Sequence, residues 1–294
     1  MPSLKDIRAR IGSVRNISQI TRAMELVAAS RMKRAQEAIM AARPYSDELR
    51  SALSRVAAAV GEEVDPLLAR RPVHKLGLVV MTSDRGLAGA LDSNTVRSAL
   101  RYVEERSAEV SGQLEVAAVT VGRKGRDQLR RAGVPIAAHF PRLGDRPSFA
   151  DVTPVARLVS EDFLAGEYDE IAIVYPGFIT TLNQQPTVTT LLPVPRPADL
   201  SDEEAARTDE YLIEPSPDVV LGRLLPHYVA VDMFRAVLES NASEQSARMV
   251  AMRAATDNAL ELIDDLTLVY NKTRQATITR EMIEIASGAE ALGG

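Results

Sequence analysis

The feature that most constrains the fold of this chain is a coiled-coil repeat of apolar residues at its start. Four apolar residues keep a 3,4,3 spacing, which is typical of one seam of a paired helix: Leu4, Ile7, Ile11 and Val14. We expect the seam then to shift to a second set, Ile17, Ile20, Met24 and Val27. Because no proline interrupts residues 3–43, the pattern predicts one helix that continues to about residue 60.

The other end of the chain carries a matching repeat. Seven residues keep the heptad step, with Thr and Ala at positions where a strong zipper has Leu or Ile: Met252, Thr256, Ala259, Ile263, Leu266, Tyr270 and Thr273. Residues 1–43 hold nine Lys or Arg and three acids, whereas residues 239–294 hold five Lys or Arg and nine acids. Opposite charge favours pairing of the two ends, so we expect a coiled coil built from residues 1–60 and 218–294.

Between the two ends, short β-branched runs alternate with helical patterns and turn residues. We expect a Rossmann-like domain over residues 75–195, with strands at 76–82, 114–121, 134–140 and 170–175. The expected helices are 92–107, a short one that follows a turn at 122–125 and ends at 131, and 153–165. Asp92 or Ser93 is the expected N-cap of the first of these helices. Pro176 to Pro186 reads as a turn before an antiparallel edge strand at 187–192, and residues 196–217 read as an acidic, Pro-rich connector.

The composition excludes several classes of function. The chain has no cysteine, which excludes disulfides, thiolate nucleophiles and Cys-based metal sites. With no Trp and 4% aromatic residues, it lacks the stacking platforms of a single-strand nucleic-acid binder. No stretch approaches the roughly 20 apolar residues that cross a bilayer, so membrane association is expected only through partners.

The sequence gives little support to an active site. Gly86, Gly89, Gly122 and Gly125 follow strands where phosphates dock, but neither G-x-G-x-x-G nor G-x-x-x-x-G-K-[ST] occurs. We therefore interpret them as tight-turn glycines, and Asp84 with Arg85 as a loop ion pair rather than a catalytic pair. The three histidines are far apart in sequence and are expected to be structural: His74, His139 and His227. We expect no catalytic residue, no cofactor and no metal site.

Several segments resemble the gamma subunits of F-type ATP synthases, and the likeness covers essentially the whole chain. The matching stretches are residues 5–8 (KDIR), 20–32 (ITRAMELVAASRM), 43–45 (RPY), 82–87 (TSDRGL), 211–212 (YL) with 214–215 (EP), 242–259 (ASEQSARMVAMRAATDNA) and 269–279 (VYNKTRQATIT). The resemblance implies an α/β protein with a long antiparallel N- and C-terminal coiled coil and an inserted, mostly parallel Rossmann-like domain.

The resemblance also implies a function and a set of partners. The chain would be the non-catalytic rotor of the central stalk, seated in a ring of three alpha and three beta subunits. It would also contact the epsilon subunit and the membrane c-ring, on the cytoplasmic face of a bacterial inner membrane. The implied contacts with beta are Arg22, Met24 and Arg31 at its lever loops and Glu244, Arg248, Arg274 and Gln275 at its catch loops; Tyr211 would lie in the foot on the c-ring and epsilon.

Two alternatives from other classes remain at this point. One is a small-molecule enzyme built on the sheet, with the helices as dimerisation arms. The other is a nucleic-acid or chaperone clamp that uses the basic first helix, although the net charge of −5 gives no whole-molecule case for nucleic acid.

Overall fold

The computed structural model describes residues 3–59, 65–110, 112–141, 143–195 and 213–293. The chain divides into two compact units, one formed by both chain ends (1–28 with 249–294) and the other by residues 29–248. Two long helices contribute to both units: α1 (Leu4–Ala59) and α6 (Pro217–Gly293). The long terminal helices expected from the sequence are thus confirmed.

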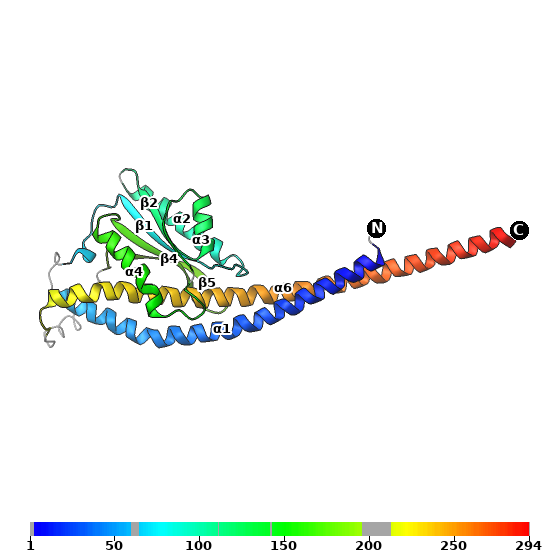
Figure 1. The fold of residues 1–294 in the computed structure, drawn as a ribbon, viewed down its shortest axis with the longest axis horizontal. Coiled ribbons are helices and arrows are strands. Elements are labelled where there is room, and N and C mark those ends of the chain that lie inside the picture. Colours follow the sequence, from blue (N-terminus) through cyan, green and yellow to red (C-terminus); the bar gives the residue numbers. More distant parts are fainter. Residues whose placement is uncertain (1–2, 60–64, 111, 142, 196–212, 294) are drawn as a thin grey trace. The chain divides into compact units, whose positions relative to one another are not determined.

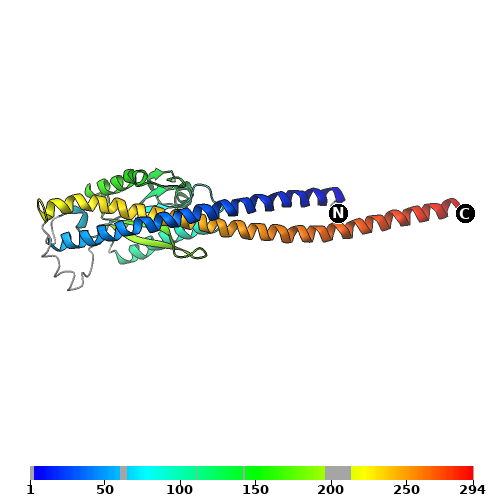
Figure 2. The ribbon, with the colours of Figure 1, turned by 90° about the horizontal axis from the view of Figure 1, so that it is seen from below.

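Local chemistry accounts for the starts of both helices. At the start of α1, the side chain of Asp6 accepts hydrogen bonds from the backbone N–H and the hydroxyl of Ser3 (3.1 and 2.7 Å), as in a capping box. Helix α6 begins at Pro217. Proline lacks a backbone N–H, but in the first turn of a helix that N–H would have no carbonyl partner, so no hydrogen bond is lost. In the unit of the chain ends, α1 and α6 lie side by side (Figure 2).

The second unit contains a five-stranded sheet in the order β3-β2-β1-β4-β5. Its elements, in chain order, are η1 (Pro66–Leu68), β1 (Lys75–Met81), α2 (Leu91–Glu109), β2 (Glu115–Val121), α3 (Arg123–Arg131), β3 (Ile136–Phe140), α4 (Phe149–Leu164), β4 (Glu170–Phe178) and β5 (Gln184–Leu192). The first four strands are parallel, and β5 pairs antiparallel with β4 at the edge. This is the expected Rossmann-like alternation (Figure 1).

The predicted turn from Pro176 to Pro186 is wrong, because most of it is a hairpin of two strands. Pro176 pairs with Pro186 in the antiparallel ladder between β4 and β5. Proline is tolerated there for a physical reason: β4 pairs with β1 only as far as Val174, and β5 is an edge strand, so neither proline removes a ladder hydrogen bond on both sides.

Two helix starts also differ from the expectation. Helix α2 begins at Leu91, and the carboxylate of Asp92 accepts hydrogen bonds from the backbone N–H and hydroxyl of Ser83 (2.8 and 2.6 Å) instead of capping the helix. Helix α4 begins one turn earlier than predicted, because Ser148 and Asp151 form a capping box ahead of Phe149.

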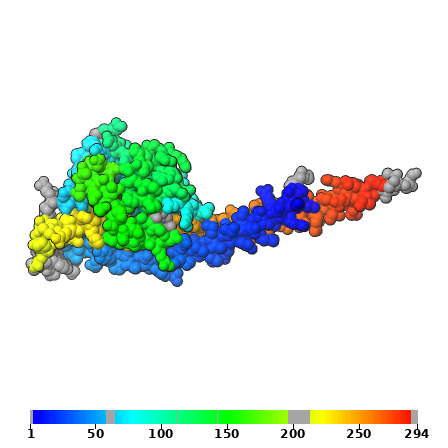
Figure 3. All heavy atoms as spheres, viewed as in Figure 1, coloured from blue at the N-terminus to red at the C-terminus, as the bar shows by residue number. Residues whose placement is uncertain are grey.

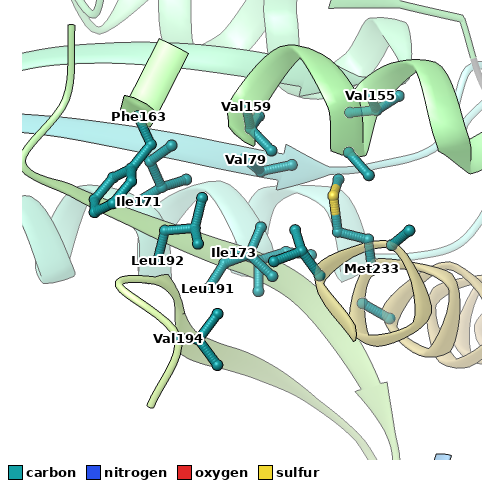
Figure 4. Packing of buried hydrophobic residues seen from close by; sticks show 14 of the residues in the cluster. Val79, Val155, Val159, Phe163, Ile171, Ile173, Leu191, Leu192, Val194 and Met233 are labelled. Carbon is teal, nitrogen blue, oxygen red and sulfur yellow. The ribbon is translucent and has the colours of Figure 1, made fainter. Parts of the chain in front are cut away.

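Each face of the sheet packs into its own hydrophobic core. One face contacts α4, the first half of α6 and the end of α1, with Val155, Val159 and Phe163 of α4 buried over the strands (Figure 4). The other face is covered by α2 and α3 through Val96, Ala99 and Leu129. Each fully buried Val, Leu or Phe side chain contributes about 1.5–3 kcal/mol. The two cores therefore hold together the sheet and its helices, from η1 to β5, which we call the module. In the space-filling view, this module and the start of α6 form one continuous surface (Figure 3).

Candidate partner-contact site

The two chain ends pair through a narrow antiparallel seam. Thr21 and Thr256 contribute hydroxyls whose oxygens lie 2.7 Å apart in the buried seam. Nearer the N-terminus, the Arg8 Nη2 donates to the hydroxyl of Tyr270 (2.5 Å), and the guanidinium lies 5.5 Å from the centre of the tyrosine ring. Early residues of α1 therefore meet late residues of α6, which is the antiparallel arrangement.

The α6 side of the seam is the one predicted from the sequence. Its residues are buried or half-buried at every predicted heptad position, and Thr277 extends the row: Met252, Thr256, Ala259, Ile263, Leu266, Tyr270 and Thr273. Small side chains at several of these positions let the two helices approach closely.

The predicted shift of the α1 seam is wrong. The heptad continues without a break through Val14, Ser18, Thr21 and Ala28, which are all buried. Ile17, Ile20 and Val27 instead stay 51–59% exposed on the neighbouring face of the helix. The regular spacing decides which residues face the partner helix, and it places two polar residues in the seam while leaving an apolar stripe exposed.

Four predicted contact residues lie in the unit of the chain ends. Arg22 is exposed, and its Nη1 lies 2.9 Å from Glu25 Oε2. Met24 is half-buried beside the seam, and Arg274 and Gln275 are exposed near the end of α6. All four are therefore at least partly accessible to a partner in the isolated chain.

The other three described residues lie in the second unit and make internal contacts. Arg31 forms an ion pair with Asp145 (2.7 Å). Glu244 is buried, and it pairs with Arg248 (2.6 Å), whose side chain is only 12% exposed. The Arg248 Nη2 also donates to the backbone carbonyl of Gly86 (3.1 Å), in the loop after β1. Tyr211 lies outside the described residues.

Residues 241–248 of α6 form a polar segment that is hydrogen-bonded to three different loops of the module. Beyond the bond of Arg248 to the β1 loop, the Asn241 side chain donates to the carbonyl of Asp145 (3.2 Å). The hydroxyl of Ser246 donates to the carbonyl of Thr181 in the β4–β5 hairpin. These hydrogen bonds are directional, so they fix the rotation of this part of α6 against the module, which hydrophobic contact alone does not do.

Sequence reasoning missed this arrangement. The run NASEQSAR (residues 241–248) has few apolar residues, so its sequence resembles that of a helix face exposed to solvent. The one signal in the sequence is that this segment of the helix is rich in uncharged side chains that form hydrogen bonds, whereas an exposed helix face usually alternates acidic and basic residues.

The loops at the carboxyl ends of the strands are filled by the chain's own groups. The first three amides of α3 donate to the loop after β1: Arg123 to Asp84 Oδ1 (2.8 Å), Lys124 to Ser83 O (3.0 Å) and Gly125 to Thr82 Oγ1 (2.8 Å). A Cβ at Gly122 would lie 2.0 Å from the Thr82 carbonyl, so this glycine serves close backbone packing. The donors that would bind a phosphate at this helix start are thus already used.

The remaining candidate groups are dispersed. The His227 Nε2 lies 2.6 Å from the Tyr45 hydroxyl, and the His139 Nδ1 lies 3.1 Å from Thr120 Oγ1. Within the described residues, no group of three or more His, Cys, Asp or Glu is arranged to hold a metal. The cavity beside Thr82 and Glu244 measures about 20 Å³, which is room for a water molecule and far too small for a nucleotide.

No helix in the described part of the chain combines the length and the apolar content that a membrane span requires. Fold and contacts together define a class: a protein whose two long terminal helices pair antiparallel at the chain ends and whose middle forms a mostly parallel α/β domain.

Comparison with known proteins agrees with this class. The family model described as ATP synthase matches residues 3–292. The ATP synthase gamma chain of Roseiflexus castenholzii is 50% identical over 294 residues, covering 99% of both chains, and that of Dehalococcoides mccartyi (strain CBDB1) is 47% identical, covering 99% of this chain and 100% of the relative. The chain belongs to the ATP synthase gamma chain family.

Solved structures share the fold at lower sequence identity. The Euglena gracilis mitochondrial ATP synthase (OSCP/F1/c-ring, rotational state 3) contains a chain that matches with a TM-score of 0.68 at 19% identity, covering 98% of this chain and 94% of that one. A chain of the central stalk and c-ring structure from Tetrahymena thermophila matches with a TM-score of 0.59 at 24% identity, covering 80% of this chain and 99% of that one.

Proposed function

We propose that this chain is the rotor of an F-type ATP synthase, coupling ion flow across a membrane to ATP synthesis or hydrolysis in sites formed by alpha and beta subunits. The observation that carries the proposal is the antiparallel pair of chain-end helices, joined at Thr21 and Thr256, in a chain that matches gamma chains over its whole length. A rotor must transmit torque, and continuous helices with directional side contacts resist twisting better than loops do.

The C-terminal end of α6 supports an enclosing partner. Ile278, Met282 and Ile285 are 48, 65 and 73% exposed, and they lie in one stretch of helix. Exposed apolar residues gathered in this way are typical of an interaction surface. A ring of three alpha and three beta subunits would cover them, and the apolar contact would allow the helix to turn without breaking hydrogen bonds.

Most of the proposed contacts with beta are residues that are at least partly exposed in the isolated chain. We propose that Arg22, Met24 and Arg31 face the lever loops and that Arg274 and Gln275 face the catch loops. Glu244 and Arg248 stay proposed catch-loop contacts as well. Because Arg248 already binds Gly86, a partner must compete with that hydrogen bond.

The chain itself is proposed to be non-catalytic. Support comes from the backbone amides at the start of α3, which the chain's own groups already occupy. We further propose that Tyr211 contacts the c-ring and epsilon. The assembled complex would hold the chain on the cytoplasmic face of the membrane, without membrane insertion or nucleic-acid binding by the chain itself.

Reconstitution tests the proposal directly. Alpha and beta subunits are mixed with the full chain or with its Arg274→Ala/Gln275→Ala variant, and ATP-driven rotation and ATPase activity are measured. We expect the full chain to be required for rotation, and the variant to lower the torque several-fold while it still assembles. Arg253→Ala, an exposed arginine on the same helix, is the matched control and should behave as wild type. Full rotation-coupled activity without the chain would contradict the proposal.

A further inference from the structure

Helix α3 carries a concentration of positive charge that the rotor model does not use. Five of its nine residues are basic and one, Asp127, is acidic: the basic residues are Arg123, Lys124, Arg126, Arg130 and Arg131. The chain as a whole has a net charge of −5, so this surface runs against the overall charge.

The burial of α3 turns these charges outward. Leu129 is fully buried against the sheet, and Gly125 is buried beside it. Arg123, Arg130 and Arg131 are exposed. Leu129 is therefore the one large apolar side chain that holds the helix on the sheet, and the three arginines lie on its solvent side. The Arg123 Nη2 also donates to the backbone carbonyl of Asp84 (3.1 Å).

Helix stability accounts for only part of the charge, since the dipole favours Arg130 and Arg131 in the last turn. Arg123 and Lys124 lie in the first turn, where the helix dipole disfavours cations. Arg126 and Arg130 are four residues apart and repel each other. Asp127 offsets part of this: it pairs with Arg126 (2.9 Å), and its pKa is lowered first by that hydrogen bond and then by the nearby arginines. The cationic first turn and the repulsion between Arg126 and Arg130 are thus kept at a cost to the helix.

The neighbouring helix adds two exposed arginines, although its second half also exposes Glu104, Glu105 and Glu109. Helix α2 packs beside α3 on one face of the sheet (Figure 1), and its Arg97 and Arg101 are exposed. Arg97 donates to the amide oxygen of Asn94 (3.1 Å), a neutral partner. We call the exposed arginines of the two helices the α2–α3 basic surface: Arg97, Arg101, Arg123, Arg130 and Arg131.

The chemistry of the surface selects a class of partner. Exposed guanidinium groups bind carboxylates in a bidentate manner. Among the described residues, none of the exposed large apolar side chains lies on α2 or α3, so the surface lacks the apolar face of a membrane-bound helix. The aromatic ring of Tyr102 is half-buried against the core beneath α2 and α3, and its hydroxyl donates to Glu170 (2.6 Å), so it offers no open platform for base stacking.

We propose that the α2–α3 basic surface binds an exposed acidic segment of a partner polypeptide in the assembled complex. The inference rests on the proposed function, since it requires a complex of several chains. It adds a contact through α2 and α3, beyond the residues of α1 and α6 discussed above.

Zero-length cross-linking in the assembled complex tests this. A carbodiimide joins an amine to a carboxylate only where the two touch, so the variant Arg123→Lys/Arg130→Lys/Arg131→Lys keeps the charge and supplies amines. We expect a product that joins the α3 peptide to an acidic peptide of another subunit, with a yield that falls several-fold at about 1 M salt. The matched control is Arg10→Lys/Arg15→Lys, which places amines at exposed positions of α1.

A second variant gives an independent measurement. Arg123→Glu/Arg130→Glu/Arg131→Glu should weaken retention of the partner subunit at least 10-fold, whereas Arg10→Glu/Arg15→Glu should not. Cross-links confined to this chain's own Asp84 and Asp127, a salt-independent yield, or tighter binding of the full chain to phosphatidylglycerol vesicles or duplex DNA than to the partner would overturn the inference. If the unmodified chain does not assemble, the proposed function fails too; assembly without an α3 product refutes this inference alone.

Discussion

The hydroxyl oxygens of Thr21 and Thr256 lie 2.7 Å apart in the buried seam between the two ends of the chain. Each hydroxyl also contacts its own helix: Thr21 Oγ1 lies 3.1 Å from the Ser18 carbonyl, and Thr256 Oγ1 lies 2.9 Å from the Met252 carbonyl. A directional polar pair stands where a zipper would have apolar residues, so it sets the register of the helices while adding little stability.

A double-mutant cycle measures this register contact. Thr21→Val and Thr256→Val each remove one hydroxyl, and the remaining one keeps its bond to its own helix. We expect each single variant to lower the free energy of unfolding by about 1 kcal/mol, and the double variant to lose about 1 kcal/mol less than the sum, in urea unfolding followed by circular dichroism. Strict additivity would show that the hydroxyls do not interact.

Arg248→Ala should destabilise the isolated chain. Its removal leaves the buried carboxylate of Glu244 without its ion pair and the Gly86 carbonyl without this donor. We expect a loss of about 3 kcal/mol in unfolding free energy, because an uncompensated buried charge is costly. The double variant Glu244→Gln/Arg248→Met should recover part of the loss, and Arg253→Ala should change stability by less than about 0.5 kcal/mol. An unchanged midpoint for Arg248→Ala would contradict the internal role.

Glu239 should make stability depend on pH. Burial raises the pKa of its carboxyl above the ordinary 4.5, against the opposing effects of Arg235 and of the Phe178 backbone. The folded state therefore binds the proton more tightly than the unfolded state, and stability falls as pH rises from 4.5 through the raised pKa. Glu239→Gln should melt at a higher temperature than wild type at pH 7, with the difference vanishing in acid. Glu37→Gln, at an exposed position of α1, should show no such difference.

Tyr175 should titrate late in alkali. Burial, and then the nearby Glu239 carboxylate, raise the pKa of its hydroxyl from 10.0 to about 12. Stability should accordingly fall as pH rises between these two values, because the unfolded state ionises first. Absorbance at the phenolate band should show a late-titrating fraction that decreases in Tyr175→Phe. A single titration of all seven tyrosines near pH 10 would contradict this burial.

Much of the fold could be predicted because its signals are periodic. The heptad of α6 and the alternation of strands and helices repeat over many residues, and tertiary contact did not override them. The errors came where single residues misled: Ile17 and Ile20 look like seam residues but are exposed, and Ser18 and Thr21 look exposed but are buried. In the hairpin, Pro176 and Pro186 suggested a turn because an edge strand cannot be recognised before the sheet order is known.

The candidate site could be predicted only in part, because sequence does not show which polar groups meet. Arg248 and Gly86 are 162 residues apart, and no pattern in either segment predicts that they are in contact. Arg274 and Gln275 form no pattern that marks them as contacts, and they are proposed from the resemblance alone. Long-range hydrogen bonds depend on how the module packs onto α6, which only the folded structure specifies.

Rotation of a single labelled site tests the central claim most directly. Because the chain has no cysteine, Leu182→Cys at the exposed tip of the β4–β5 hairpin gives one unique attachment point for a bead or fluorophore. In a complex immobilised through alpha and beta, the account predicts that ATP drives the label around one axis, in one direction, in steps of roughly 120° as a three-fold ring requires. A label that stays still while the complex hydrolyses ATP at its full coupled rate would contradict the account.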